Sequence, residues 1–489
     1  MRKISSCLGF ALACLAGIGG ASAQGLSPAM PVDVANLPHP SATDWNELAW
    51  QSFVAANWPV VSRQLGVPDP NLRIGAKDAA GMPLPVLWMT SKSPQDVFVD
   101  VGQVPSSDWQ SRVPVAACAQ VPGYDPKTSY VLTMVSKTAG PAFTAIDQAA
   151  FPGSKQVIGP LIDRAGHYVR YDIRMSQSEF QYILNFNYYS AVEQNAAVNA
   201  NPPTFKFPPL TGQEPYLQLP AYAKYGTVEY KASWRELNPG VDIVSRYFST
   251  QAFIVDPDGK CHGPHLMGLT GLHVLRLTPS TPRTWFWSTF EQVDNLTVPV
   301  PPPRRPDGAP LTPSFGDGKV FVAGYDHMPP PVAPGQPLPP NPPVDVSRLT
   351  PIQSAAEPVT RAYQRALAGT IWENYQLVGT QFPVNPIQNG QPQGNGKGTG
   401  ECYAAGPNHQ ADASFQINDC YLSNVTMETY VQSTGCVACH AFGAPLGVPL
   451  ATKDPTPQPT FPALAKFQMF SFMLLQAKCP TPKPDWCVR

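Results

Sequence analysis

Five consecutive residues near the end of the chain combine two thiols with an imidazole. They read Cys436-Val437-Ala438-Cys439-His440 in a chain of 489 residues. Thiols at this spacing lie on one turn and can add to the two vinyl groups on one edge of a porphyrin, and the next residue brings an imidazole beneath the iron. The spacing predicts one covalently attached haem c, held by Cys436 and Cys439, with His440 as the proximal iron ligand.

Three other interpretations of these five residues stay open. A redox disulfide of the thioredoxin type requires an alternating pattern of strands and helices around the motif, which the sequence lacks. Half of a zinc site requires a second Cys/His pair at finger-like spacing, and none follows. The third interpretation is a structural disulfide beside an unrelated histidine.

The sixth iron ligand is a separate question. Met469 and Met473 follow the motif in an apolar, helix-like stretch, and Met469 is the candidate we name first. Methionines in such a stretch also serve as core residues. The alternatives are Met427 upstream, a histidine, or an open position. Methionine ligation suits electron transfer, whereas an open position permits chemistry with peroxide or a small ligand.

The residues around the motif resemble a cytochrome c domain. Val425–Ser433 reads as a short helix that stops near Gly435, as in domains that lead a helix into the attachment motif. The resemblance covers the last ~90 to 140 residues and rests on the CxxCH motif. It implies a small, mainly α-helical haem domain. The whole layout is similar to larger bacterial exported proteins with one C-terminal cytochrome c-like region.

The first residues have the pattern of an export signal. Arg2 and Lys3 precede an apolar run, and Ala21-Ser22-Ala23 provides small residues before a cleavage point. We therefore expect a periplasmic protein without a transmembrane segment in the mature chain, and lipid anchoring at Cys14 is the less favoured alternative. A net charge of −1 gives no reason to expect a nucleic-acid partner.

Eight cysteines remain outside the signal, and haem takes two of them. The other six allow fifteen disulfide pairings. Proximity in the sequence favours Cys402–Cys420 and Cys479–Cys487, which leaves Cys118–Cys261 by elimination.

The composition favours short strands and extended connections. The chain is 43% hydrophobic and contains 59 prolines, which disfavour long helices. We predict an α+β fold: a signal peptide at 1–23, a β-rich domain at 24–298, a proline-rich linker at 299–343 and the cytochrome c-like haem domain at 344–489. Helices are expected at Ser41–Trp58 and Thr360–Gln376, and strands at Tyr130–Val135, His167–Met175, Gly226–Arg235, Gly271–Leu277 and Trp285–Phe290.

A second candidate site lies on the predicted strands. Glu229, Lys231, Ser233 and Arg235 alternate with apolar residues and share one face. If the strands are neighbours, the following residues line a pocket able to move protons: Glu229, Lys231, Arg235, His273, Glu291 and Asp294. The alternative is a solvated sheet face with a locally satisfied histidine.

The sequence supports two functions and one alternative without haem. The first is electron transfer by a monohaem cytochrome that docks a periplasmic redox partner protein. The second is a redox enzyme, in which the β-rich domain oxidises a small molecule or the haem reacts with peroxide. The alternative is a disulfide-stapled binding protein. We find no dinucleotide fingerprint, P-loop or serine nucleophile elbow in the sequence.

Overall fold

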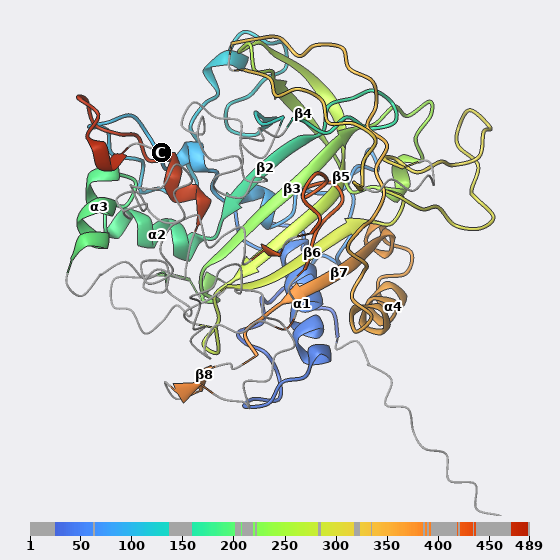
Figure 1. Ribbon diagram of the computed structural model, residues 1–489, viewed down its shortest axis with the longest axis horizontal. Helices are drawn as coiled ribbons and strands as arrows, with labels where there is room; N and C mark the ends of the chain where they lie inside the picture. The colour runs from blue at the N-terminus through green and yellow to red at the C-terminus, as the bar shows by residue number, and fades with distance from the viewer. Residues whose placement is uncertain are drawn as a thin grey trace, which may run out of the picture.

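The structure is a computed structural model, in which a curled β-sheet is flanked by short helices and long connections (Figure 1). It describes residues 25–61, 64–135, 159–200, 207, 219–220, 223–281, 285–316, 323–333, 335–384, 387–388, 391–392, 418, 421–433, 435–436 and 471–487. The α-helices in this part are α1 (Ala42–Ala56), α2 (Gln177–Asn185), α3 (Ala191–Asn199) and α4 (Ala356–Ala366). The strands are β1 (Tyr130–Leu132), β2 (Arg170–Met175), β3 (Val228–Glu236), β4 (Ser249–Val255), β5 (Cys261–Arg276), β6 (Phe286–Gln292), β7 (Tyr375–Gln381), β8 (Ile387–Gln388) and β9 (Gln391–Pro392).

Helix α1 has well-defined ends. Ser41 and Asp44 form a capping box, in which each side chain accepts a hydrogen bond from the other residue's backbone N–H, at 3.3 and 2.7 Å. At the other end, the Asn57 side chain donates to the Phe53 carbonyl, and Pro59 follows. The predicted helix Ser41–Trp58 is therefore confirmed within two residues at each end.

Strand β5 is the centre of the main sheet. It pairs antiparallel with β3 along one side, and along the other side first with β4 and then with β6. β2 extends the sheet beyond β3, and β7 extends it beyond β6. All five strands predicted from the sequence are present, and Gly271–Leu277 is the end of the much longer β5.

The sheet curls because its edges approach each other. β1 runs parallel to β4, and just after β1 an isolated bridge joins Met134 to Tyr171 of β2 at the opposite edge. The Tyr130 hydroxyl also hydrogen-bonds to Asp172 of β2. The sheet is consequently mixed rather than purely antiparallel.

One face of the sheet carries the main hydrophobic core. Val228, Tyr230, Ala232 and Trp234 of β3 point into it, as the alternation predicts. Helices α1 and α4 cover this face beside β6 and β7 (Figure 1). Aromatic rings dominate the contact, since Phe53 stacks on Phe290 at 4.2 Å between ring centroids.

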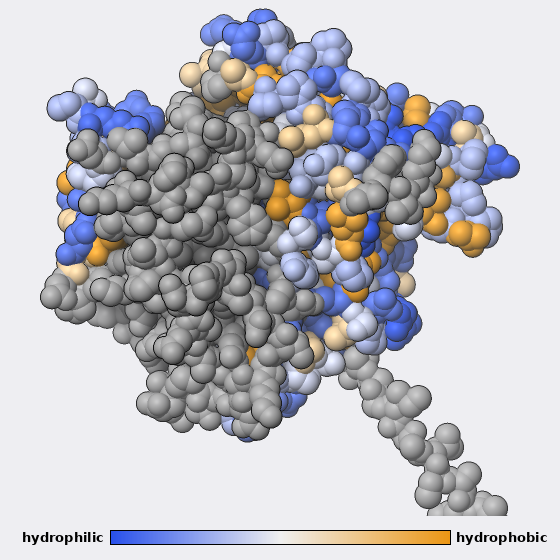
Figure 2. All heavy atoms as spheres, in the orientation of Figure 1, coloured by the Kyte–Doolittle hydropathy of each residue, from blue (hydrophilic) through white to orange (hydrophobic). Residues whose placement is uncertain are grey.

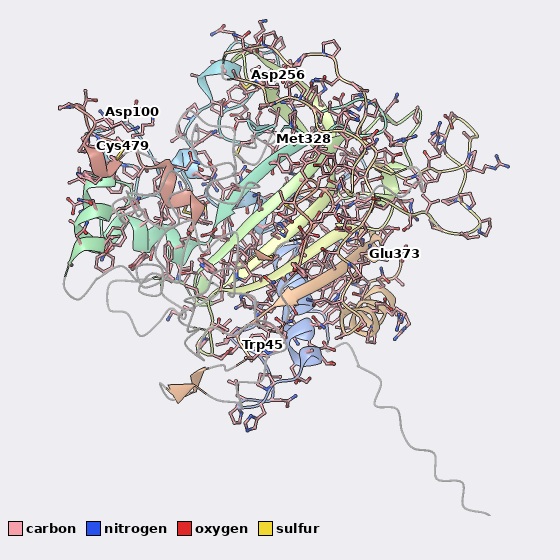
Figure 3. The ribbon with its side chains drawn as sticks, viewed as in Figure 1. Trp45, Asp100, Asp256, Met328, Glu373 and Cys479 are labelled. Atoms are coloured by element: carbon pink, nitrogen blue, oxygen red, sulfur yellow. A yellow bond between two sulfur atoms is a disulfide. The ribbon has the colours of Figure 1, made fainter. Side chains whose placement is uncertain are left out.

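The opposite face is covered by segments from the end of the chain. Residues 421–433 lie across β3, β5 and β6, and we call them the covering segment. Residues 471–487 pack beside α2 and α3, where Gln194 donates to the Leu474 carbonyl at 3.0 Å (Figure 1). Lys478 pairs with Asp100 at the same end of the molecule, next to Cys479 (Figure 3).

The predicted fold class, with a separate and mainly helical C-terminal domain, is wrong. About 20% of the structure is helical, and the sheet crosses the proline-rich stretch because β7, from residues 344–489, pairs with β6. The predicted helix Thr360–Gln376 is instead α4 and a 3-10 turn at Ile371–Asn374. The predicted helix Val425–Ser433 is a series of turns.

Two of the three predicted disulfides are confirmed, namely Cys118–Cys261 and Cys479–Cys487. Cys402 and Cys420 lie outside the described residues. Within the described part, no helix is long and apolar enough to cross a membrane. On the face shown in Figure 2, apolar side chains are scattered among hydrophilic ones over the described residues.

Candidate functional site

The strands that carry the predicted polar residues are neighbours. Lys231 of β3 lies opposite His273 of β5, which in turn lies opposite Thr289 of β6. The predicted proton pocket required these strands to be neighbours, and that condition is therefore confirmed. The face is not solvated, however, because the covering segment buries it: His273 is only 8% exposed.

Three of the six predicted residues belong to separate structural ion pairs. Arg235 binds Asp163 and Asp242, both at 2.8 Å. Asp294 lies beyond the end of β6 and binds Arg246 through two hydrogen bonds of 2.5 and 2.7 Å. These residues are therefore fixed by their own partners and do not converge on one pocket. The same holds for Glu291, which pairs with Arg348 and accepts a hydrogen bond from the Val425 N–H.

His273 meets a carboxylate that the sequence did not point to. Its Nε2 lies 3.3 Å from Oε1 of Glu428, in the covering segment. The other oxygen of Glu428 accepts a hydrogen bond from the Asn424 N–H at 2.8 Å. Residues 155 positions apart in the chain form this pair, so no local pattern could have predicted it.

Glu229 has an unexpected partner, Glu179, on the first turn of α2. Both side chains are buried, and their carboxyl groups lie close enough to change each other's proton affinity. Neither oxygen of Glu179 accepts a hydrogen bond. Two buried acids side by side are costly to ionise together, so the pair favours a state in which one of them is protonated.

Burial sets the proton affinity of this acid pair. It raises the pKa of Glu229 to about 7, although hydrogen bonds from Ser471 and Glu179 and the charge of Lys231 oppose the shift. Burial, followed by the charge of Glu229, raises the pKa of Glu179 well above its ordinary value. The pair therefore changes charge near neutral pH, which is a property of groups that transfer protons.

The acid pair borders an apolar cluster that we call the aromatic cluster. Glu229 lies in register between Met175 and Leu275, and Glu179 precedes Phe180 in the chain; all three neighbours belong to the cluster. Its other large side chains include Tyr182, Phe207, Trp285, Trp287 and Met473. The indole N–H of Trp285 is buried without an acceptor. A buried donor of this kind is available to a ligand oxygen.

Cys436, the first residue of the predicted haem motif, packs against the aromatic cluster and is partly buried. Cys439 and His440, which complete the motif, lie outside the described residues, as does Met469. Met473 is buried within the cluster, whereas Met427 packs in a different cluster with Val425. Among the described methionines, Met175 of β2 and Met473 thus share a cluster with Cys436, and Met473 is the one that follows the motif in the sequence.

The surroundings of Cys436 fit a haem group. A porphyrin offers two large apolar faces and two charged carboxylate arms, so it requires aromatic or aliphatic walls and a few donors. The aromatic cluster supplies such walls, and Trp285 supplies a donor. Among the described residues, no group of three or more histidine, cysteine or acidic side chains is arranged to hold a metal ion.

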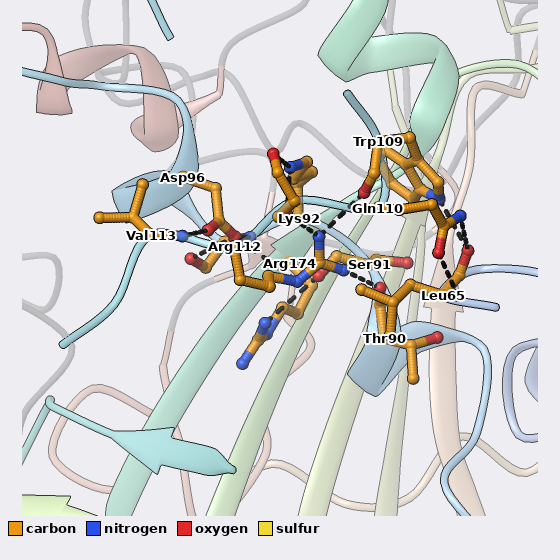
Figure 4. Close-up of polar contacts among 12 residues, drawn as sticks. Leu65, Thr90, Ser91, Lys92, Asp96, Trp109, Gln110, Arg112, Val113 and Arg174 are labelled. Atoms are coloured by element: carbon orange, nitrogen blue, oxygen red, sulfur yellow. Dashed lines mark hydrogen bonds and ion pairs between the residues drawn. The ribbon is translucent and has the colours of Figure 1, made fainter. Parts of the chain in front are cut away.

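A groove of about 2330 Å³ lies between the loops before β1 and residues of β1, β2 and β4, and Phe98, Ala477 and Cys487 of the aromatic cluster also line it. Figure 4 shows charged residues beside it, with Lys92 and Arg112 from the loops and Arg174 from β2. Lys92 donates to the Asp108 carbonyl at 3.0 Å and to Ser111, while Arg174 binds Asp172 at 2.7 Å. These cations tie the loops to β2.

Sequence reasoning found Glu229 but missed Glu179 and Glu428. Ser176-Gln177-Ser178-Glu179 matches the pattern of a helix N-terminal capping box, and Ser176 does cap α2. That pattern would have located the helix, though not the contact with Glu229. Comparison of the chain with protein-family models, curated proteins and solved structures found no match.

Proposed function

We propose that this chain is an exported, periplasmic redox protein that carries one haem c, attached through Cys436 and Cys439, with His440 as the proximal iron ligand. The observation that carries the proposal is the CxxCH motif, whose first cysteine packs against the aromatic cluster. Bound haem supplies a reversible one-electron change at iron. The favoured function is electron transfer to or from a periplasmic partner protein.

The residues around the motif have distinct tasks in this proposal. The aromatic cluster excludes water from the porphyrin faces and lowers the local dielectric constant. The Trp285 indole N–H donates to a carboxylate arm. Met473 is the described candidate for the sixth iron ligand, because it follows the motif in the sequence and is buried in the cluster against which Cys436 packs.

A redox enzyme is the second candidate, and the acid pair favours it. Electron transfer alone does not require a group that titrates inside an apolar cluster, whereas oxidation of a small molecule or reduction of peroxide moves protons together with electrons. Glu229, with a pKa of about 7, is able to accept and return a proton near neutral pH. The Glu179–Glu229 pair is then the proton-handling group of the site.

Haem retention in denaturing electrophoresis tests the covalent attachment. The chain is produced with its export signal and with the cytochrome c maturation machinery, and the gel is stained for haem. We expect haem staining of the wild type, its loss in the double variant Cys436→Ser/Cys439→Ser, and its persistence in a control that replaces Cys118 and Cys261 by serine. Absence of stain in the wild type, or its survival in the motif variant, would overturn the proposal.

The sixth ligand is tested by a matched pair of methionine variants. Met473→Ala should convert a low-spin haem spectrum into a high-spin one that binds CO, while Met427→Ala should leave the spectrum unchanged. If neither variant changes a low-spin spectrum, Met469 is the next methionine to replace. A high-spin spectrum in the wild type would favour the enzyme.

A further inference from the structure

Two histidines and two carboxylates form a continuous chain at the start of β5, far from the haem motif in sequence. His262 Nε2 lies 3.0 Å from Asp256, and its Nδ1 lies 2.7 Å from Nε2 of His265. The remaining nitrogen of His265, Nδ1, lies 2.9 Å from Glu236 at the end of β3. Asp256, which is labelled in Figure 3, shows where these four linked side chains lie, near the end of β4.

The hydrogen-bond partners of the two rings favour a cation between them. A neutral imidazole carries one N–H, and an N–H on each outer nitrogen faces a carboxylate. With the protons so placed, His262 Nδ1 and His265 Nε2 present lone pairs to each other at 2.7 Å. An extra proton or a metal ion between the rings removes the repulsion of these lone pairs.

The local structure holds the two rings together. The Cys118–Cys261 disulfide anchors the residue before His262, and Gly263 adopts a φ of +129°, a conformation that favours glycine. A Cβ on Gly263 would lie 3.0 Å from the Ala252 carbonyl and 3.2 Å from the His265 ring. The turn therefore brings histidines three positions apart to the same side of the strand.

The surrounding charge favours a cation. Asp256 and Glu236 contribute two negative charges, and Arg170, bound to Asp256 at 2.7 Å, contributes one positive charge. The imidazoles are 42% and 26% exposed, so water and ions reach them. Carboxylates that accept from the outer nitrogens of metal-bound histidines fix the tautomer and strengthen the ligand.

We propose that His262 Nδ1 and His265 Nε2 together bind a divalent first-row transition metal ion, with water completing its coordination. Two metal–nitrogen bonds of about 2.0–2.1 Å at an angle near 90–110° place the nitrogens roughly 2.9–3.3 Å apart, a few tenths of an ångström wider than observed. Entry of the ion releases the shared proton to solvent. Imidazole ligands suit Cu²⁺, Ni²⁺ and Zn²⁺, and Cu²⁺ binds most tightly in this series.

Titration of the mature, full-length protein with Cu²⁺ tests this site. Calorimetry should show binding that His262→Ala and His265→Ala each weaken at least tenfold, and electron paramagnetic resonance should show two nitrogen ligands in the wild type. His327→Ala is the matched control, because His327 is a half-exposed histidine beside Asp326. It should leave this binding unchanged. Thiols and other histidines bind Cu²⁺ as well, so only the difference between matched variants is interpreted.

Two further variants test the carboxylates that hold the histidines in place, separately from the histidines that bind the ion. Asp256→Asn and Glu236→Gln keep the side-chain size but weaken the hydrogen bonds to the outer nitrogens, and should reduce Cu²⁺ affinity about 10- to 100-fold. Both positions are partly exposed, and circular dichroism checks that each variant folds. Copper binding that is the same in the wild type and in both histidine variants, or a signal without two nitrogen ligands, would overturn the proposal. The result does not depend on haem attachment.

Discussion

Two groups of buried charges lie on the covered face of the sheet, and they are neutralised in opposite ways. Arg235 and Asp163 form an ion pair of opposite charges, both less than 6% exposed, and Asp242 adds a second carboxylate. Glu179 and Glu229 are equally buried, but they are two acids in contact. In the first group Arg235 balances one of the two carboxylates, whereas the two acids of the second group must keep a proton to lower their charge.

Because of this difference, we expect the ion pair to have a structural role and the acid pair to have a role in function. An ion pair of fixed geometry stabilises one arrangement of its strands and does not change its charge near neutral pH. The acid pair carries an electrostatic cost that rises with pH, and residues with such a cost are found at sites that do chemistry. The acid pair borders the aromatic cluster that contains Cys436, and this location is what we expect of a proton-handling group.

The largest expected effect comes from breaking the ion pair. Arg235→Met leaves the carboxylate of Asp163 buried without its cation, so the free energy of unfolding should fall by about 3–5 kcal/mol. Lys260→Met is the control, because Lys260 is exposed to water and its pair with Asp258 should contribute far less to stability. Urea denaturation of both variants at pH 7 measures the difference. Equal losses would show that burial does not distinguish the two pairs.

Replacing one acid of the acid pair should have the opposite effect on the free energy of unfolding, and raise it at high pH. Glu229 has a pKa of about 7 in the folded chain and 4.5 as its ordinary value, so between these pH values the folded chain binds more protons than the unfolded chain. The free energy of unfolding therefore falls as pH rises from about 4.5 to about 7, by on the order of 3 kcal/mol from this group. Glu229→Gln should remove the part of this fall that comes from Glu229 and stabilise the protein at pH 8, while Glu179 keeps its own contribution.

Denaturation of Glu229→Gln across this pH range provides the measurement. Glu357→Gln is the control, because Glu357 is exposed on α4 and pairs with the equally accessible Arg361. The control should keep the wild-type pH profile. A wild-type profile in Glu229→Gln would mean that the acid pair does not bind a proton in this range.

A smaller effect is expected where the covering segment approaches the sheet. A Cβ on Gly271 would lie 2.6 Å from Thr426 Oγ1 and 2.8 Å from Ser233 Oγ. Gly271→Ala should cost about 1–3 kcal/mol and increase hydrogen exchange of the covering segment. Gly25→Ala, where the added Cβ meets nothing within 4 Å, should leave exchange of that segment unchanged.

The smallest effect concerns the capping box of α1, away from both groups of charges. Ser41→Ala removes the side-chain acceptor for the Asp44 N–H and should cost about 0.5–2 kcal/mol. Thr43→Ala, at an exposed position in the same helix, should cost nothing. Thermal denaturation of the two variants compares them, and an equal effect would exclude the cap as the cause.

Local sequence patterns predicted the helix whose ends are fixed by neighbouring residues and the strand whose polar and apolar residues alternate regularly. The capping residues located α1, and alternating residues located β3 together with the side of it that faces the core. The end of α4 was missed although it carries a local signal. Gly369, with a φ of +80°, follows Leu367 and stops the helix, and β7 begins six residues later.

The remaining differences arise from contacts that are distant in sequence. Residues 425–433 have a helical pattern, but Asn424 binds Thr289 and Thr426 binds Ser233, and these side-chain bonds to the sheet replace helical ones. The acid pair depends on the packing of α2 against β3, which no spacing within either element reveals. The haem motif, by contrast, depends only on five adjacent residues and stays a prediction from the sequence.

The reduced-minus-oxidised visible spectrum of the mature protein, recorded after the chain has been denatured and separated from unbound haem, tests the central claim most directly. The account predicts a c-type spectrum that remains with the polypeptide and disappears in Cys436→Ser/Cys439→Ser. A polypeptide without haem absorption, from cells that mature a reference cytochrome c normally, would contradict it.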